Sequence, residues 1–261
     1  MGTDRQDDYV RALAFGLLDE SERGAAAGRL VELIRGAGGH LGTGFLSTPL
    51  LLDALVANGH AETAWDLLTS TSNPCWLHQV ALGATTVWET WEGYKKSGKA
   101  KMSHNHYALG SVARLLTERV AGITPDEPGY RLIGTRPLTG GGLTWARASV
   151  GTPYGLVESN WSIDGDEVHY RISVPPGARA RFEARADAAS IDLGPGAHVI
   201  TRSRSNGADA APVGSNRLPN LSSFDWIAVR SSRPIPHPSE AHRCRRRPFS
   251  RGSTPTLRSA A

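Results

Sequence analysis

One short run in the middle of the chain places an acid between large aromatic rings. Glu89 lies in Trp88-Glu89-Thr90-Trp91. A carboxylate beside indole rings loses solvation, and a carboxyl group in such a setting suits proton transfer. Aromatic faces also offer large, flat surfaces on which a sugar ring can stack. Glu89 is therefore a candidate catalytic residue, although the spacing equally allows Glu89 to face solvent while the tryptophans pack inward.

Two histidines follow in the run Ser103-His104-Asn105-His106-Tyr107. On a strand, His104 and His106 would point to one face as metal ligands, but at the start of a helix their rings diverge. No third ligand lies nearby in the sequence, so we predict no metal site. His106 is a candidate hydrogen-bonding partner for a neutral polar ligand, and capping or packing is an equal alternative. The glycine-rich runs lack the strand and helix of a phosphate loop, so we predict no cofactor.

The distribution of charge bears on the class of partner. Residues 202–261 carry 11 arginines against three acidic residues, whereas residues 1–201 carry 18 basic against 22 acidic residues. The net positive charge of the chain therefore lies in residues 202–261, and we predict no nucleic-acid partner. The polar, acidic start shows neither a secretory signal nor a membrane span, so we predict a cytoplasmic protein that does not contact membranes. Cys75 and Cys244 lie too far apart to indicate a disulfide framework.

The elements that must position Glu89 and His106 are predicted first as helices. Apolar residues recur at helical spacing through the N-terminal part, and short polar or glycine-containing turns separate the segments. Asp19-Glu20-Ser21-Glu22 is typical of a helix start. We predict two antiparallel helices between Tyr9 and Arg35, a pair over 48–56 and 61–68, and a pair over 82–91 and 105–120.

A β domain is predicted after Ile123. The run from Thr124 to Gly129 contains two prolines and breaks any helix, and the following segments alternate apolar and polar residues. Asp164-Gly165-Asp166 is typical of a hairpin turn. We predict a small antiparallel β-sandwich, with strands over 143–149, 155–161, 167–174, 180–184, 190–191 and 197–201.

The last sixty residues differ in character from the rest. Residues 202–261 are rich in Ser, Arg, Pro and Gly, with few aliphatic residues and no sustained periodicity. Such a segment cannot bury enough surface to offset its ordering entropy, so we predict a disordered basic tail. A sudden change of this kind is also what a shift of reading frame in GC-rich DNA would produce.

Several motifs in a fixed order resemble the bacterial α-L-rhamnosidases of glycoside hydrolase family 78. The resemblance covers residues 4–200 and fails only in the tail. The motifs that carry it are Gly39-His40-Leu41-Gly42-Thr43-Gly44-Phe45, Gly83-Ala84-Thr85-Thr86-Val87-Trp88-Glu89-Thr90-Trp91-Glu92-Gly93, Ser103-His104-Asn105-His106-Tyr107, Val120-Ala121-Gly122-Ile123, Gly141-Gly142-Leu143-Thr144-Trp145-Ala146 and Thr152-Pro153-Tyr154-Gly155.

The resemblance implies a domain plan and a set of roles. Residues 1–123 would be the last part of an (α/α)6 catalytic barrel, 124–201 the C-terminal β-sandwich, and 202–261 the tail, with a frameshift as its alternative origin. Glu89 would be the general base that activates water, and His106 would contact the sugar. The walls of the substrate pocket would be Trp88, Trp91 and Trp76.

The same resemblance implies that one catalytic group is missing. An inverting glycosidase needs a second carboxyl group at about 6.5–9.5 Å from the base. In the family that general acid lies upstream, in an Asp-Gly-X-X-X-Glu-like region, and nothing before Gly39 matches it. We therefore predict part of an α-L-rhamnosidase, an O-glycosyl hydrolase that removes terminal non-reducing α-L-rhamnose from rhamnosides with inversion. This piece would be inactive without the upstream barrel segment. The alternative is a non-catalytic carbohydrate-binding or structural remnant.

Overall fold

The fold begins with two helical hairpins. The computed structural model describes residues 3–184, 189–204 and 229–230. Helices α1 (Gln6–Ala14) and α2 (Glu20–Gly36) form the first hairpin, and α3 (Thr48–Ala57) and α4 (Ala61–Thr69) form the second. The Asp19 amide donates to the Glu22 carboxylate at 3.1 Å, which caps α2 as the sequence predicts. The predicted helices of this region are therefore confirmed.

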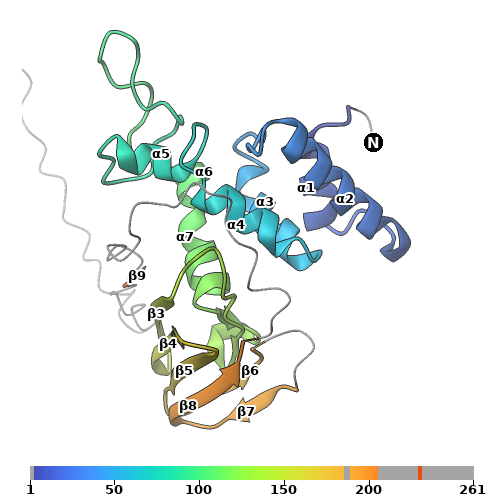
Figure 1. The fold of residues 1–261 in the computed structure, drawn as a ribbon. Coiled ribbons are helices and arrows are strands. Elements are labelled where there is room, and N and C mark those ends of the chain that lie inside the picture. The colour runs from blue at the N-terminus through green and yellow to red at the C-terminus, as the bar shows by residue number, and fades with distance from the viewer. Residues whose placement is uncertain (1–2, 185–188, 205–228, 231–261) are drawn as a thin grey trace, which may run out of the picture.

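The third helical pair differs from the prediction. The predicted helix over 82–91 is wrong, because α5 (Trp76–Ala81) ends earlier and residues 82–106 form a long loop with one bridge, Tyr94 to Ala100. The second predicted helix is confirmed but segmented, into α6 (Tyr107–Gly110), α7 (Val112–Leu115) and the π-helical turn η1 (Leu116–Val120). Figure 1 shows α7 running from the helices toward the strands at the opposite end of the molecule.

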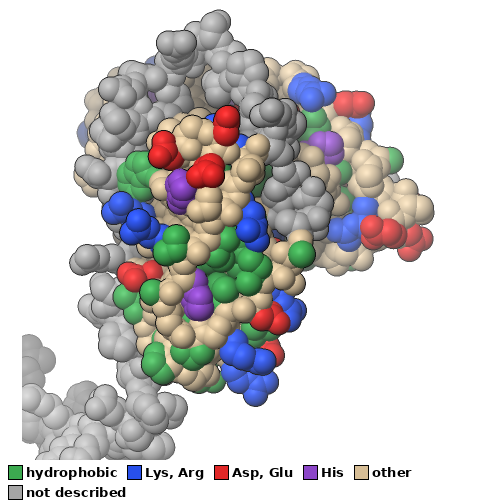
Figure 2. Space-filling view, turned by 60° about the horizontal axis from the view of Figure 1, so that its bottom comes forward, with side chains coloured by type: hydrophobic (Ala, Val, Ile, Leu, Met, Phe, Trp, Pro, Cys, Tyr) green, Lys and Arg blue, Asp and Glu red, His purple; other side chains and the backbone are tan. Residues whose placement is uncertain are grey.

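Two sheets follow. The first contains β1 (Ile123–Pro125), β2 (Leu132–Thr135), β6 (Arg179–Phe182) and β7 (Ile191–Leu193), in that order. The second has the order β8-β5-β4-β3-β9, with β3 (Trp145–Thr152), β4 (Gly155–Asp164), β5 (Glu167–Val174), β8 (Gly196–Ser203) and β9 (Val229–Arg230). A 3-10 turn, η2 (Pro128–Tyr130), lies between β1 and β2. Seen from this end, acidic, basic and apolar side chains are interspersed on the surface (Figure 2).

The two-sheet prediction needs correction in its details. The sheets are not purely antiparallel, because β2 pairs with β6 and β3 pairs with β9 in parallel. The segment 124–129, expected only to break a helix, includes the last two residues of β1. Most of the predicted tail lies outside the described residues; within it, Arg202 and Ser203 belong to β8, and 229–230 form β9. No helix in the described part of the chain is long and apolar enough to span a membrane.

Helices and sheets are joined by buried contacts. The Trp161 indole donates to the carbonyl of Val120 at 2.7 Å, and the Ser159 hydroxyl donates to that of Ala121 at 2.6 Å. Trp65 of α4 packs into the same core as the strands. A side chain at Gly140 or Gly141 would overlap the Trp65 ring, which explains the glycines of this turn. The sheets therefore hold the end of the helical region in place.

Candidate functional site

Glu89 and His106 lie on two chain segments that pair across the long loop. The Glu89 amide donates to the Ser103 carbonyl at 2.9 Å, and the Ser103 amide returns a hydrogen bond to Oε2 of Glu89 at 3.0 Å. Farther along, the His106 amide donates to the Val87 carbonyl at 2.9 Å. The Thr86 hydroxyl also donates to the carbonyl of His104. These bonds bring the predicted base and the predicted sugar contact into one local structure.

A buried amide holds the backbone on both sides of Glu89. Oε1 of Gln79 accepts from the Trp88 amide at 3.0 Å, and Nε2 donates to the Thr90 carbonyl at 3.1 Å and to the Trp88 carbonyl at 3.5 Å. Gln79 is 2% exposed. Because Gln79 belongs to helix α5, it anchors the loop to the helical core. Gln79 is not among the residues predicted from the sequence, where its only signal is a polar side chain on a short, mostly apolar helix.

The aromatic residue before Glu89 is enclosed by protein groups. Trp88 is 3% exposed, its ring stacks on that of His104 at 4.5 Å, and Tyr94 meets it edge-on at 5.3 Å. Gly93, with φ 64°, covers the same ring so closely that a Cβ there would overlap Cε3 and Cζ3 of the indole. The Trp88 ring therefore forms the packed base of the loop that presents Glu89.

The other two tryptophans form an edge-on pair. Trp76 is 6% exposed and donates from its indole to the Leu109 carbonyl at 2.9 Å. Trp91 is half-buried, with its ring centroid 5.3 Å from that of Trp76. Within the described residues, Trp76 and Trp88 are thus core residues, while Trp91 keeps part of its surface exposed. The roles of all three as pocket walls stay predictions.

His106 caps helix α6 while leaving one ring nitrogen available. Its Nδ1 accepts from the Ala108 amide at 3.3 Å. A neutral ring with Nδ1 as acceptor carries its proton on Nε2, which makes Nε2 a donor. Within the described residues no hydrogen bond involves Nε2. Phe45, at 4.9 Å, and Tyr107, at 5.0 Å, lie against the ring, and both are exposed. His106 therefore caps helix α6 and packs against two aromatic rings, and its Nε2 remains a donor for a ligand.

A second acid lies on the same loop. Glu92 pairs with Lys101, whose ammonium nitrogen is 2.9 Å from Oε2. This hydrogen bond lowers the pKa of the Glu92 carboxyl below its ordinary value. A general acid must be protonated near neutral pH, so Glu92 is unsuited to that role. Among the described residues, no three His, Cys, Asp or Glu side chains gather closely enough to hold a metal ion.

Comparisons with known proteins assign both parts of the chain. A family model of the bacterial α-L-rhamnosidase 6 hairpin glycosidase domain matches residues 1–120, and one of the bacterial α-L-rhamnosidase C-terminal domain matches residues 122–189. An α-L-rhamnosidase of Formosa agariphila is 40% identical over 189 residues, which are 71% of this chain and 20% of that protein. An α-L-rhamnosidase of Streptomyces avermitilis is 39% identical over 188 residues, which are 70% of this chain and 18% of that protein.

Solved structures agree with these matches. The structure of the Streptomyces avermitilis α-L-rhamnosidase complexed with L-rhamnose superposes with a TM-score of 0.73 and 35% identity, covering 78% of this chain and 22% of that one. Native α-L-rhamnosidase from Aspergillus terreus gives a TM-score of 0.73 and 34% identity, and the match covers 77% of this chain and 24% of that one.

The helical hairpins thus match the six-hairpin glycosidase domain, and the two-sheet region matches the C-terminal domain that follows it. Within that class, the chain belongs to the bacterial α-L-rhamnosidase family. The chain spans about a fifth of the length of the curated relatives that it matches.

Proposed function

We propose that this chain supplies the base-bearing part of an active site that hydrolyses terminal α-L-rhamnosides with inversion at the anomeric carbon. Glu89 takes the proton from the attacking water, and Nε2 of His106 donates a hydrogen bond to a sugar hydroxyl. The observation that carries this proposal is the anchoring of Glu89. Its carboxylate accepts from the Ser103 amide, and Gln79 holds the peptide groups on either side. A general base needs this kind of fixed geometry.

The choice of substrate rests on the relatives. One matching structure was solved with L-rhamnose bound, and it shares 35% identity with this chain. The exposed rings of Phe45 and Tyr107 beside His106 provide apolar surface next to a hydrogen-bond donor. That combination suits a deoxysugar, which presents a methyl group together with hydroxyl groups. Rhamnose-containing glycosides are therefore the proposed substrate class.

The general acid is proposed to come from a part of the barrel outside these 261 residues. The hydrogen bond from Lys101 lowers the pKa of the Glu92 carboxyl, which disfavours the protonated form that a general acid needs. Acid assistance contributes about 10²–10⁴-fold to the rate, so a chain with only the base would turn over very slowly. The present helices would then be the last part of an (α/α)6 barrel.

Complementation tests this arrangement. The isolated chain is expected to release no measurable nitrophenol from p-nitrophenyl α-L-rhamnoside. Mixing it with a polypeptide that carries the rest of a related barrel, including the acid, should restore hydrolysis in proportion to complex formation. If the isolated chain hydrolysed the substrate at the restored rate, the proposal that the general acid lies outside these 261 residues would be contradicted. A complex that forms, as shown by size-exclusion chromatography, but stays inactive would contradict the catalytic role.

Gln79 offers a test of how Glu89 is positioned. Gln79→Leu should lower the free energy of unfolding by about 1–3 kcal/mol, because buried backbone groups lose their partners. In the complemented enzyme it should also lower kcat more than it raises KM, since a displaced base weakens the transition state. Urea denaturation and steady-state kinetics measure the two effects.

Gln6 provides the matched control for Gln79. It is also buried, accepting from the Gly42 amide at 2.7 Å and donating to the His40 carbonyl at 3.2 Å. Gln6→Leu should cost similar stability but leave kcat of the folded complex unchanged. Equal kinetic effects of the two substitutions would show that Gln79 has only a structural role.

A further inference from the structure

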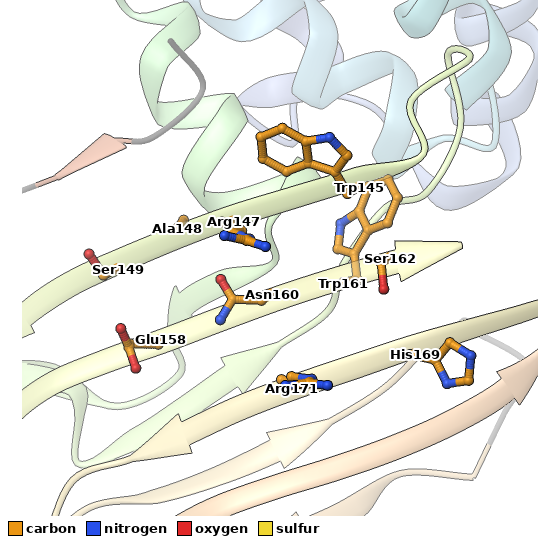
Figure 3. Close-up of a pocket in the computed structure, with 10 residues that line it drawn as sticks. All are labelled: Trp145, Arg147, Ala148, Ser149, Glu158, Asn160, Trp161, Ser162, His169 and Arg171. Carbon is orange, nitrogen blue, oxygen red and sulfur yellow. The ribbon is translucent and has the colours of Figure 1, made fainter. Parts of the chain in front are cut away.

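The outer face of the five-stranded sheet carries a shallow polar cavity that the proposed hydrolysis does not use. Its volume is about 680 Å³, and β3, β4 and β5 contribute its side chains. Figure 3 shows these side chains along three neighbouring strands. We call this surface the outer-face cavity; its lining residues include Trp145, Arg147, Glu158, Asn160, His169 and Arg171. The long loop with Glu89 lies at the other end of the molecule (Figure 1).

Strand register places two arginines in one row across this face. Arg147 lies opposite Asn160, and Asn160 lies opposite Arg171. Adjacent strands are about 4.8 Å apart, so the two arginine Cα atoms are separated by roughly 10 Å. Both side chains are exposed, and within the described residues neither forms an ion pair. With the neutral Asn160 between them, these two arginines give this row a net positive charge, which favours a surface that meets anions.

The row of residues on one side of the two arginines adds groups that recognise sugars. Trp145 is half-buried, and the Arg147 guanidinium lies 5.6 Å from its ring centroid. Its row continues through Ser162 to His169, which is hydrogen-bonded to Thr201 at 3.0 Å. An indole face offers a stacking surface, and hydroxyl and amide groups both donate and accept hydrogen bonds.

Among the described residues that line the outer-face cavity, Glu158 is the one acid, and it lies in the next row. Outside this lining, the Glu167 carboxylate lies 3.6 Å from Nε2 of His169. Glu158 is opposite Ser149 on β3 and Ser173 on β5. Its negative charge would repel an anionic group from that end of the face, and its carboxylate can accept hydrogen bonds from sugar hydroxyls. The positive charge is therefore concentrated at the row of Arg147 and Arg171. A basic segment or nonpolar ligand would leave both guanidinium groups without partners.

We propose that the outer-face cavity binds an acidic oligosaccharide, with sugar carboxylates at Arg147 and Arg171 and a neighbouring sugar ring on Trp145. Guanidinium groups bind carboxylates through two parallel hydrogen bonds, so the arginines select charged sugars over neutral ones. The β-sandwich would thereby hold the chain on an acidic glycan, independently of Glu89.

Calorimetric titration of the 261-residue chain tests this proposal. Trigalacturonate should bind, and its fully methyl-esterified form should bind at least about tenfold more weakly, because a charged hydrogen bond contributes about 1.5–3 kcal/mol. Arg147→Gln and Arg171→Gln should each weaken trigalacturonate binding about tenfold, and added salt should weaken it further. Trp145→Ala should weaken binding of both sugars.

Arg202→Gln is the matched control. Arg202 is exposed on β8 of the same sheet, but its register partner is Val168, which faces the core rather than the cavity. This variant should bind trigalacturonate normally. The proposal would be overturned if trigalacturonate and its methyl ester bound with equal affinity, or if both arginine variants kept full affinity for trigalacturonate. It would also be overturned if neither sugar bound, or if inorganic phosphate bound as tightly as trigalacturonate. Because this experiment measures binding and not turnover, failure of the oligosaccharide proposal would leave the proposed role of Glu89 untouched. Failure of the proposed role of Glu89 would likewise leave the oligosaccharide proposal untouched.

Discussion

Replacing Glu89 by glutamine is expected to reduce kcat of the complemented rhamnosidase by about 10²–10⁴-fold, because an amide cannot accept the proton of the attacking water. The loss should occur without unfolding. The amide oxygen of glutamine can still accept from the Ser103 amide, which donates to Oε2 of Glu89 at 3.0 Å in the native chain. Initial rates on p-nitrophenyl α-L-rhamnoside measure the effect, and circular dichroism of the isolated variant checks its fold.

Azide and product stereochemistry separate the role of a base from other roles of Glu89. Azide is already an anion and needs no deprotonation, so it should partly restore nitrophenol release by Glu89→Gln. The product would be the β-configured rhamnosyl azide. The native complex should first release β-L-rhamnose, as followed by proton NMR, because inversion of an α-glycoside yields the β-anomer. Initial release of α-L-rhamnose would contradict the general-base role, and so would unchanged kcat in Glu89→Gln.

The helical hairpins could be predicted from the sequence because their signals are local. Apolar residues at helical spacing account for the buried positions of α2, which include Leu30 and Ile34, and the Asp19–Glu22 cap marks its start. The predicted strands β3, β4 and β5 follow period-two alternation, and their buried residues face one side. Such patterns depend only on neighbours in the chain.

The structure around Glu89 could not be predicted in this way, because distant contacts determine it. The segment 82–91 contains enough apolar residues to suggest a helix. Gly83, with φ 84°, ends helical geometry there, and pairing with 103–106 replaces helical hydrogen bonds. Likewise, β2 has only four residues and pairs in parallel with β6, so that Leu132 is opposite Arg179. Too short to show alternation, β2 is stabilised by a partner that no local pattern indicates.

Gly93→Ala is expected to destabilise the chain by about 2–5 kcal/mol, the largest effect of a single methyl group at the site. One part of the cost is the positive φ of 64°, which a residue with a Cβ adopts at about 1–2 kcal/mol. The other part is overlap of the new methyl group with the rigid Trp88 ring, and overpacking of this kind costs about 1–3 kcal/mol. Urea denaturation followed by tryptophan fluorescence measures the change.

Gly98→Ala separates these two costs, because Gly98 lies in the same loop with φ 76° and has no atom within 4 Å of the position that the alanine methyl group would take. This control should lose only about 1–2 kcal/mol. The difference between the two variants then reports the packing of Trp88 against Gly93. Since Trp88 precedes Glu89 and shares its Gln79 anchor, Gly93→Ala should also lower kcat of the complemented enzyme, whereas Gly98→Ala should not. Equal stability losses in both variants would show that the ring moves aside freely, and that the close packing beneath Glu89 does not position the base.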